Sequence, residues 1–552
     1  MDHSATVCGA RRLRAWLAAP LAAVGDVAAR QDVVAFLLRG ADGGCVEGLL
    51  RECGKVGDVE ATMGKLYAKR CGVLEYIRVL RMARSVCLLA KEAKASATAP
   101  LPALLDQQLS LCSSSVIEEF LSTHAAELHS TATNPLDFFT EKGVAVPQRL
   151  QDLMRARDHA LAALADELER VKHVLQLPGL EYRSIGGTPF LLDIPSSKTG
   201  RAEADWLVLT RTKTNVRYHT PVIIEQNTAL CAARERLVAG ANEEWEQKQH
   251  ELATNDAVKE ALGGLIDAVA TLDALRSLSI TSGGAGYVRP RMTAADSAEA
   301  VVSIKGARHP VLDRLLPGGY VGCDVQLAAG GTWLLTGPNM GGKSAFMRMI
   351  GLLAVMAQMG CYLPAASAQL PVFSGVYCRM GASDSILEGS STFLTEMDET
   401  NRILRADGLS SALVLMDELG RGTSSFDGAA VAAATLEHLL RVRATVLFVT
   451  HYSYICEPYA QRAHGRVACY YMGFEEKEVR GEDGKTEKKL IFTYQPCRGI
   501  TPSSFGVEVA QLAGLPACVT EEARRLSAEG EREQVQRLSA LRVKQFLHGA
   551  SK

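Results

Sequence analysis

One ten-residue stretch constrains this chain more than any other: residues 336–345 read TGPNMGGKSA. Four residues within it match the phosphate-loop pattern G-x-x-x-x-G-K-[ST]: Gly337, Gly342, Lys343 and Ser344. Such a loop works between a strand and a helix, and WLLT precedes it while SAFMRMIGLLAVMAQMG follows. The sequence therefore predicts an α/β domain that binds a nucleotide, with Lys343 on the β- and γ-phosphates and Ser344 on Mg²⁺.

After about residue 285, short apolar runs alternate with helical patterns. The clearest strands are predicted within 411–418, 444–451 and 489–495, and the apolar residues from 301 onward lead into the strand that enters the phosphate loop. This alternation is typical of a parallel sheet with crossover helices. The charge-dense stretch EEKEVRGEDGKTEKK (475–489) contains two glycines, and we interpret it as a mobile surface insertion.

Two of these strands end in residues that could act on a bound nucleotide. LVLMDELGRG ends an apolar strand in Asp417 and Glu418, which would support Mg²⁺ and polarise the attacking water, respectively. A helix N-cap followed by a surface Glu is the plain alternative, and the preceding apolar strand and phosphate loop disfavour it. His451, in FVTHY, also follows an apolar strand. A single His is more often structural, but here it could hydrogen-bond the γ-phosphate or the water.

Before residue 285, long helical patterns dominate. Apolar residues step by three and four positions through 161–175 and again through 258–272. Two such runs, separated by about eighty residues, predict an antiparallel pair of long helices that carries a small element at its tip. The residues between them, which include EYRSIGGTPFLLDIPSSKTG, are rich in Thr, Val, Gly and Pro, as strands and turns are.

Within that element, TRTKTNVRY (210–218) carries three basic residues with no acid between them: Arg211, Lys213 and Arg217. One interpretation is a solvated strand face. The other is a tip that contacts DNA phosphates, because phosphate contacts need basic side chains and carry no base information. The sequence leaves both interpretations open.

Composition excludes several classes of function. The chain has 552 residues and a formal net charge of −2, which argues against coating nucleic acid or an anionic membrane over the whole surface. No apolar run reaches the roughly 18 residues of a membrane helix, and the start, MDHSATVCGARRLRAW, lacks the core of a signal peptide. The 14 cysteines form no C-x-x-C pair, so we expect neither a zinc site nor a disulfide framework.

With these parts in order, the chain resembles the MutS family of DNA mismatch-repair ATPases, which belong to the ABC-type class. The segments that carry the resemblance are TGPNMGGKS, STFLTEM, DELGRGTSSFDG and THY, together with GARRLRAWLAAPL and GARHPVL. Within the family, LFVTHYSYICE, YYMGFEE and YQPCRGITPSSFGVEVAQLAGLP are most similar to the eukaryotic subfamily that handles insertion–deletion loops, the MutSβ type.

The resemblance implies a multidomain architecture: an α-helical lever or core with a long helical arm and a small β-containing clamp tip, followed by an α/β P-loop ATPase domain of the ABC type. The expected ranges are 1–155 for the first part of the lever, 156–240 for the clamp arm and tip, 241–285 for a returning lever helix, 286–530 for the ATPase domain and 531–552 for a charged tail. The mismatch-reading and connector domains, and the wedge that probes DNA from the minor groove, are expected to be absent. A shortened product or gene model and a reduced paralogue both remain open.

The resemblance also assigns roles around the phosphate loop, where Pro338, Met340 and Gly341 complete the nucleotide-binding segment. Asn339 would contact the γ-phosphate. Ser391 would face the nucleotide held by the other half of a dimer, and Asp427 would belong to the D-loop at the contact between the two halves. Tyr320 and Tyr494 would stack on adenine, although a plain reading makes them ordinary aromatics. Ala345 stands where the family usually has a hydroxyl, and we expect it to tune nucleotide affinity or rate without abolishing binding.

These roles predict a clamp on double-stranded DNA that depends on ATP and Mg²⁺. The chain would work in the nucleus as one half of a heterodimer with a second MutS homologue, and it would interact with MutL-type repair proteins. We expect no association with a membrane. Alone, the chain should hydrolyse ATP poorly. Two alternatives remain: a meiotic or junction-binding homologue, and a nucleotide-binding structural subunit with little turnover. The intact Lys343, Ser344, Asp417 and Glu418 disfavour the second alternative.

Overall fold

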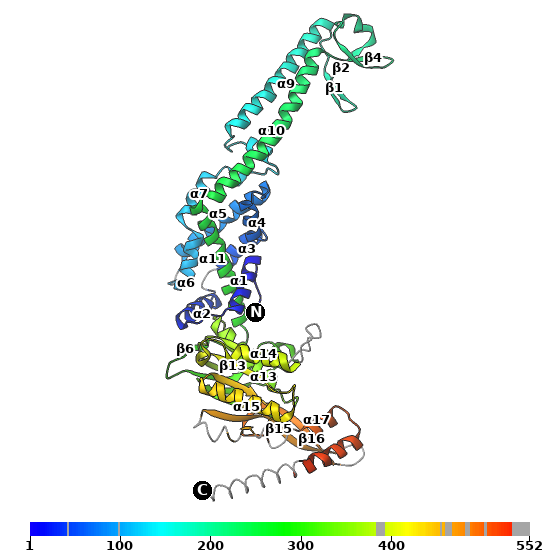
Figure 1. The fold of residues 1–552 in the computed structure, drawn as a ribbon. Coiled ribbons are helices and arrows are strands. Elements are labelled where there is room, and N and C mark those ends of the chain that lie inside the picture. Colours follow the sequence, from blue (N-terminus) through cyan, green and yellow to red (C-terminus); the bar gives the residue numbers. More distant parts are fainter. Residues whose placement is uncertain are drawn as a thin grey trace.

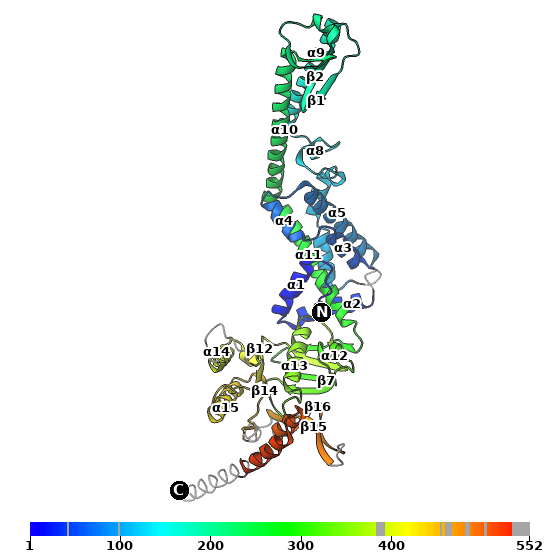
Figure 2. The same ribbon diagram turned by 90° about the vertical axis from the view of Figure 1, so that its right-hand side faces the viewer.

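The molecule is elongated (Figures 1 and 2). A helical body lies between a long two-helix arm, which carries a small sheet at its tip, and an α/β domain at the other end. The computed structural model describes residues 1–552 apart from 41–43, 98–99, 382–391, 453–454, 457, 459–465, 481–485, 502–504, 531 and 533–552.

Helix α11 (Asp256–Ser282) is the centre of the helical body. It is buried on several sides, because α1, α2, α3, α6 and α7 all pack against it. Its buried Asp273 accepts hydrogen bonds from the backbone N–H groups of Ala5 and Thr6, which fixes the start of α1 on α11. The other elements of the body are α1 (Val7–Ala18), α2 (Val24–Leu38), α3 (Cys45–Gly54), α4 (Val59–Tyr67), α5 (Val73–Ser96), α6 (Ala103–Cys112), α7 (Ser115–Thr123), η1 (Glu127–His129) and α8 (Pro135–Thr140).

The arm consists of α9 (Gln148–Leu175) and α10 (Pro221–Thr254), which run side by side (Figure 1). Thr220 caps α10 by accepting a hydrogen bond from the Ile223 N–H, and Pro221 occupies the first turn, where its missing N–H costs nothing. None of the helices in the described part of the chain is long and apolar enough to span a membrane.

The predicted pairing of 161–175 with 258–272 is wrong. The partner of α9 is α10, whereas 258–272 belongs to α11 and is periodic because the body surrounds it. The buried residues of α10 also recur at steps of three and four, but NEEWEQKQH hides this pattern with polar residues. The expected domain limits after residues 155 and 240 fall inside α9 and α10.

The tip is a four-stranded antiparallel sheet in the order β1-β2-β4-β3. Leu192 and Ile194 on β2 alternate with Asp193, so that one face of the sheet packs onto the arm while the other carries polar groups. Trp206, Val216 and Tyr218 complete the apolar face. The elements are β1 (Tyr182–Ile185), β2 (Thr188–Pro195), η2 (Ser196–Arg201), β3 (Leu207–Arg211) and β4 (Asn215–His219).

The α/β domain contains a six-stranded sheet in the order β12-β13-β14-β9-β15-β16, a four-stranded sheet in the order β6-β11-β7-β8, and the pair β10-β5. In the large sheet, β12, β13, β14, β9 and β15 run parallel, as predicted. The predicted strand at 489–495 departs from this pattern, because it lies in β16, which pairs with β15 antiparallel. Its strands are β9 (Thr332–Thr336), β12 (Val376–Arg379), β13 (Leu413–Asp417), β14 (Thr445–Val449), β15 (Val467–Arg480) and β16 (Thr486–Arg498). The others are β5 (Tyr287–Val288), β6 (Arg291–Thr293), β7 (Val301–Ala307), β8 (Cys323–Ala328), β10 (Leu363–Pro364) and β11 (Ser367–Pro371).

Helices cover both faces of the large sheet. Leu413 and Leu415 of β13 share a core with residues of α13, whereas Val414 and Met416 share another with residues of α14 and α15. Burial on both faces explains why these strands are continuously apolar. The helices are α12 (Leu312–Leu315), α13 (Lys343–Gln358), α14 (Thr392–Leu404), η3 (Leu409–Ser411), α15 (Ser425–Arg441) and α17 (Gly506–Leu512).

The charge-dense stretch 475–489, interpreted from its composition as a mobile surface insertion, is paired strand over its described residues. Except for 481–485, which lie outside the described residues, it forms the paired ends of β15 and β16, in register from Glu475 opposite Ile491 to Arg480 opposite Thr486. The composition of the stretch predicts contact with water but does not reveal cross-strand pairing, which depends on the register with 486–498.

Candidate nucleotide site

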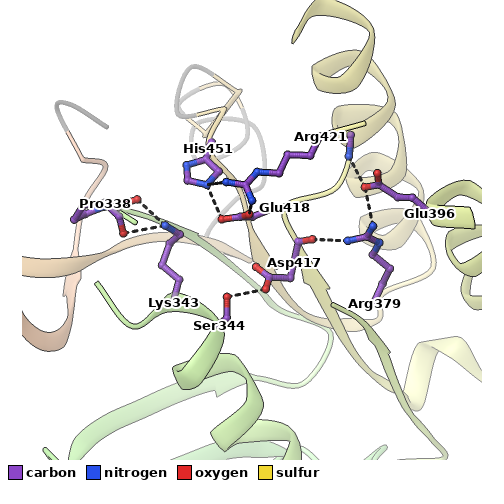
Figure 3. Close-up of polar contacts among 11 residues, drawn as sticks. Pro338, Lys343, Ser344, Arg379, Glu396, Asp417, Glu418, Arg421 and His451 are labelled. Carbon is purple, nitrogen blue, oxygen red and sulfur yellow. Dashed lines mark hydrogen bonds and ion pairs between the residues drawn. The ribbon is translucent and has the colours of Figure 1, made fainter. Parts of the chain in front are cut away.

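The phosphate loop connects β9 to α13 at the carboxyl edge of the large sheet. Gly337 and Gly342 have φ angles of +128° and +90°, which non-glycine residues rarely adopt. Lys343 folds back and donates from Nζ to the carbonyl oxygens of Gly337 (2.9 Å) and Pro338 (3.0 Å) (Figure 3). Burial lowers the pKa of Lys343 despite the nearby Glu418 and Asp417. Asn339 and Met340 are exposed at the crest of the loop.

Ser344 and Asp417 meet beside the loop. The Ser344 hydroxyl donates to Asp417 Oδ2 at 2.8 Å (Figure 3). The other carboxylate oxygen, Oδ1, is buried, and no described residue hydrogen-bonds to it. Burial raises the pKa of Asp417. A buried, partly unpartnered carboxylate next to a hydroxyl is an oxygen donor set suited to a hard divalent cation, so these two residues fit Mg²⁺.

Glu418 and His451 come together at the ends of adjacent strands. His451 Nε2 lies 2.5 Å from Glu418 Oε1, and Arg421 Nη1 lies 2.7 Å from Glu418 Oε2 (Figure 3). Burial by itself would raise the pKa of Glu418, but the hydrogen bond and charge of His451, with the charge of Arg421, outweigh burial and lower it. Glu418 is therefore a carboxylate at neutral pH, as a group that orients water must be.

The two tyrosines expected at adenine lie on segments that touch. Gln495 Nε2 donates to the Gly322 carbonyl at 2.8 Å, which joins the segment after Tyr494 to the one after Tyr320. The Tyr494 ring borders the phosphate loop, since a Cβ placed on Gly342 would lie 3.2 Å from Tyr494 Cδ1. Tyr494 thus borders the loop, and Tyr320 lies on a segment joined to that of Tyr494.

The residues expected at a dimer interface are only partly described. Ser391 lies outside the described residues. Asp427 lies in the first turn of α15, where its carboxylate accepts from the Ser424 hydroxyl at 2.8 Å and its N–H donates back to that hydroxyl. Between them, Phe426 is 85% exposed, which is unusual for a large apolar side chain.

At the tip, the three basic residues have different surroundings. Arg211 and Lys213 are exposed at the end of β3 and in the turn after it. Arg217, on β4, is only partly exposed and faces Asp193 of β2 at 3.4 Å, and Arg183 of β1 contacts the same carboxylate at 3.2 Å. The acid that is missing from TRTKTNVRY is thus supplied by a neighbouring strand.

Three residues of the site were not among the predicted ones: Arg379, Glu396 and Arg421. The signal for Arg421 is its position three residues after Glu418, and Glu396 lies within STFLTEM. Arg379 has no local signal, because its contacts are made to residues that are distant in the sequence.

These features define a P-loop ATPase domain. A glycine-rich loop joins a strand to a helix, and the polar residues Asp417, Glu418 and His451 lie at the ends of β13 and β14. Comparison with known proteins is more specific. The family profile for MutS domain V matches residues 333–530, and that for MutS domain III matches residues 1–279. The chain belongs to the MutS family, with the lever-and-clamp region followed by the ABC-type ATPase domain, which confirms the predicted fold class.

Three relatives that share one name illustrate the similarity. The human DNA mismatch repair protein Msh3 is 33% identical over 558 residues, which cover 96% of this chain and 47% of the relative. The mouse protein of the same name is 32% identical over 555 residues, covering 96% and 48%. The Cryptococcus neoformans protein of that name is 36% identical over 410 residues, which cover 73% of this chain and 33% of the relative. The chain spans about half the length of the human and mouse relatives, and its match covers a third of the fungal one.

Proposed function

We propose that this chain is an ATP-dependent DNA clamp of mismatch repair that acts on insertion–deletion loops, as one half of a heterodimer with a second MutS homologue. The observation that supports hydrolysis is the convergence of Lys343, Ser344, Asp417, Glu418 and His451 at one edge of the sheet. The similarity to proteins named Msh3 supports the subfamily.

In the proposed reaction, Lys343 leaves the carbonyl oxygens of Gly337 and Pro338 to bind the β- and γ-phosphates. Ser344 and Asp417 would hold Mg²⁺, which neutralises phosphate charge when it is bound. Glu418 orients the attacking water. His451, within hydrogen-bonding reach of Glu418, fixes the direction of that carboxylate.

The remaining parts of the proposal concern contacts that the chain makes with other molecules. Tyr320 and Tyr494 would stack on adenine. The nearly fully exposed Phe426, beside Asp427, supports a partner protein at that surface. Arg211 and Lys213 would contact DNA phosphates at the far end of the arm from the ATPase domain (Figure 1), so nucleotide-driven movement would have to pass through α9, α10 and α11. Nuclear location and MutL-type partners belong to the same proposal.

The direct test combines the chain with a second MutS homologue from the same organism and measures ATP hydrolysis with and without DNA. We expect stimulation by DNA that is lost in Glu418→Ala. Equal rates in the two proteins would contradict the catalytic assignment. Binding to a looped duplex, a fully paired duplex and a four-way junction, measured in the same complex, tests the substrate. Preference for the junction would favour the junction-binding alternative instead.

A further inference from the structure

A buried ion pair lies beside the catalytic carboxylates (Figure 3). Arg379, the last residue of β12, and Glu396, on α14, have side chains only 4% and 3% exposed, and Arg379 Nη2 lies 3.3 Å from Glu396 Oε1. Removing two charges from water costs solvation that their pairing offsets incompletely. Apolar side chains of similar size often stabilise such a position equally well, so the ion pair by itself is weak evidence for a stabilising role.

Both side chains hold the backbone that carries the catalytic carboxylates. Arg379 Nη1 donates to the carbonyl oxygen of Asp417 at 3.1 Å, and Glu396 Oε1 accepts from the Gly420 N–H at 2.7 Å. The two ends of the segment 417–420 are thus fixed by two different elements, β12 and α14.

That segment is in a strained conformation. Glu418 has a φ angle of +53°, in the left-handed region that non-glycine residues seldom occupy. Gly420 has a φ angle of +92°, and a Cβ there would lie 2.4 Å from the Gly428 carbonyl oxygen. Strained backbone persists only where its surroundings fix it. If the segment relaxed, the Glu418 carboxylate would turn away from His451.

We propose that Arg379 and Glu396 are positioning residues for ATP hydrolysis: the pair holds residues 417–420 in the strained conformation that aims Glu418 at His451, and it ties that aim to the position of α14. This inference rests on the proposed catalytic role of Glu418. A displacement of α14 would redirect Glu418 first, because Glu396 on α14 holds the Gly420 N–H, whereas Lys343 bonds only to the loop carbonyls. Ser344 is linked to the pair through Asp417, so the pair is expected to act on hydrolysis more than on nucleotide binding.

The test uses the full chain in excess over trace γ-labelled ATP, with Mg²⁺ and duplex DNA, so that a single slow turnover can be measured. The main variant is the double substitution Arg379→Met/Glu396→Leu, which leaves no unpaired buried charge and so avoids the usual cause of misfolding. Arg379→Lys keeps the charge. The matched control is Glu127→Gln, which breaks another largely buried pair, with Lys248 at 2.7 Å, in the helical body.

For the double variant we expect a fall in the single-turnover rate on the order of 10- to 100-fold, the scale that small misplacements of catalytic groups produce. MgATP affinity should stay within about threefold. The temperature of thermal unfolding should fall by no more than the loss of two backbone hydrogen bonds implies, those of the Asp417 carbonyl and the Gly420 N–H. Arg379→Lys should recover part of the rate, and Glu127→Gln should match the wild type.

Glu418→Gln separates the two ways in which this inference can fail. If Glu418→Gln is slow while the double variant hydrolyses ATP at the wild-type rate, the positioning role is overturned and the proposed function stands. A parallel loss of MgATP affinity and rate in the double variant would indicate a structural role and would also overturn it. If Glu418→Gln turns over as fast as the wild type, the catalytic proposal fails and the positioning role fails with it.

Discussion

The nucleotide site and the tip of the arm both depend on charged side chains, but they hold those charges in opposite ways. Lys343 is 4% exposed and makes two hydrogen bonds to the loop, and Arg379 is equally buried. At the tip, Arg211 and Lys213 are exposed, and no described residue pairs with either of them.

This difference predicts different responses to substitution. A buried charge has one position and one set of partners, so removing it leaves other groups unpaired. Exposed charges are solvated, screened by salt and able to replace one another. Single changes at the nucleotide site should therefore have large, specific effects, whereas changes at the tip should have small effects that depend on salt.

The largest effect is expected for Lys343→Met, since the ammonium is the group that would stabilise charge on the transferring phosphoryl. The single-turnover rate should fall by roughly 10²- to 10³-fold. Lys305→Met, an exposed lysine on β7 of the same domain, is the control and should change nothing. If Lys343→Met kept the wild-type rate, the expectation that buried charges are more sensitive to substitution than exposed charges would be wrong.

A smaller effect is expected from pH acting on Asp417. Burial raises the pKa of this carboxyl, so a proton competes with Mg²⁺ in a window that begins above 3.8, the ordinary value for aspartate. Below the raised pKa, Mg²⁺ affinity should fall about tenfold per pH unit. Without metal, the stability that this group contributes is present below pH 3.8 and is lost as pH rises through the raised pKa, because the folded chain holds the proton more tightly.

Calorimetric titration of Mg²⁺ in the presence of ADP over this pH range would measure the effect. Asp417→Asn is the control, because an amide cannot titrate there, and its weaker Mg²⁺ affinity should be independent of pH across the window. If wild type and Asp417→Asn showed the same pH dependence, Asp417 would not be the group on which Mg²⁺ and the proton compete.

The same contrast explains what the sequence could predict. The phosphate loop, Asp417, Glu418 and His451 are each marked by a local pattern: an apolar strand followed by polar residues. Parallel pairing then brings the ends of β13 and β14 together, since Asp417 lies opposite Val449. Local patterns and one rule of topology were therefore enough to predict that the phosphate loop, Asp417, Glu418 and His451 come together at this edge, but not that Arg379, Glu396 and Arg421 join them.

Features that depend on contacts between distant segments could not be predicted in this way. The partner of α9, the strand pairing within 475–489 and the neutralisation of Arg217 by Asp193 each depend on which segments become neighbours. The Arg379–Glu396 pair is the extreme case, because β12 and α14 meet only in the folded domain. Helical periodicity shows that a face is buried but does not identify the helix that covers it.

A modest, salt-dependent effect is expected at the tip. Replacing Arg211 and Lys213 together by Gln should weaken duplex binding several-fold and reduce the slope of log K against log[salt] by about 1.8, if each side chain neutralises one phosphate. Arg217→Gln is the matched comparison and should change the slope less, because Asp193 already pairs with Arg217. A larger change in slope for Arg217→Gln would mean that Arg217 contacts DNA phosphates more than Arg211 and Lys213 do. An unchanged slope in the double variant would show that the tip is not part of the DNA-binding surface.

The smallest effect is expected for Ala345→Thr, although this residue is next to Ser344. Ala345 borders an apolar cavity of about 510 Å³, whose lining includes His309, Leu352 and Leu415. A threonine hydroxyl at position 345 would have room in this cavity. It would not ligate Mg²⁺, because Ser344 and Asp417 hold the position proposed for the metal. MgATP affinity and single-turnover rate should both stay within about threefold of the wild type, because the substitution alters no group at the catalytic edge. A large gain in MgATP affinity would mean that the side chain at position 345 reaches the nucleotide. Its place next to Ser344 in the sequence would then be a better guide to its role than the cavity that it borders.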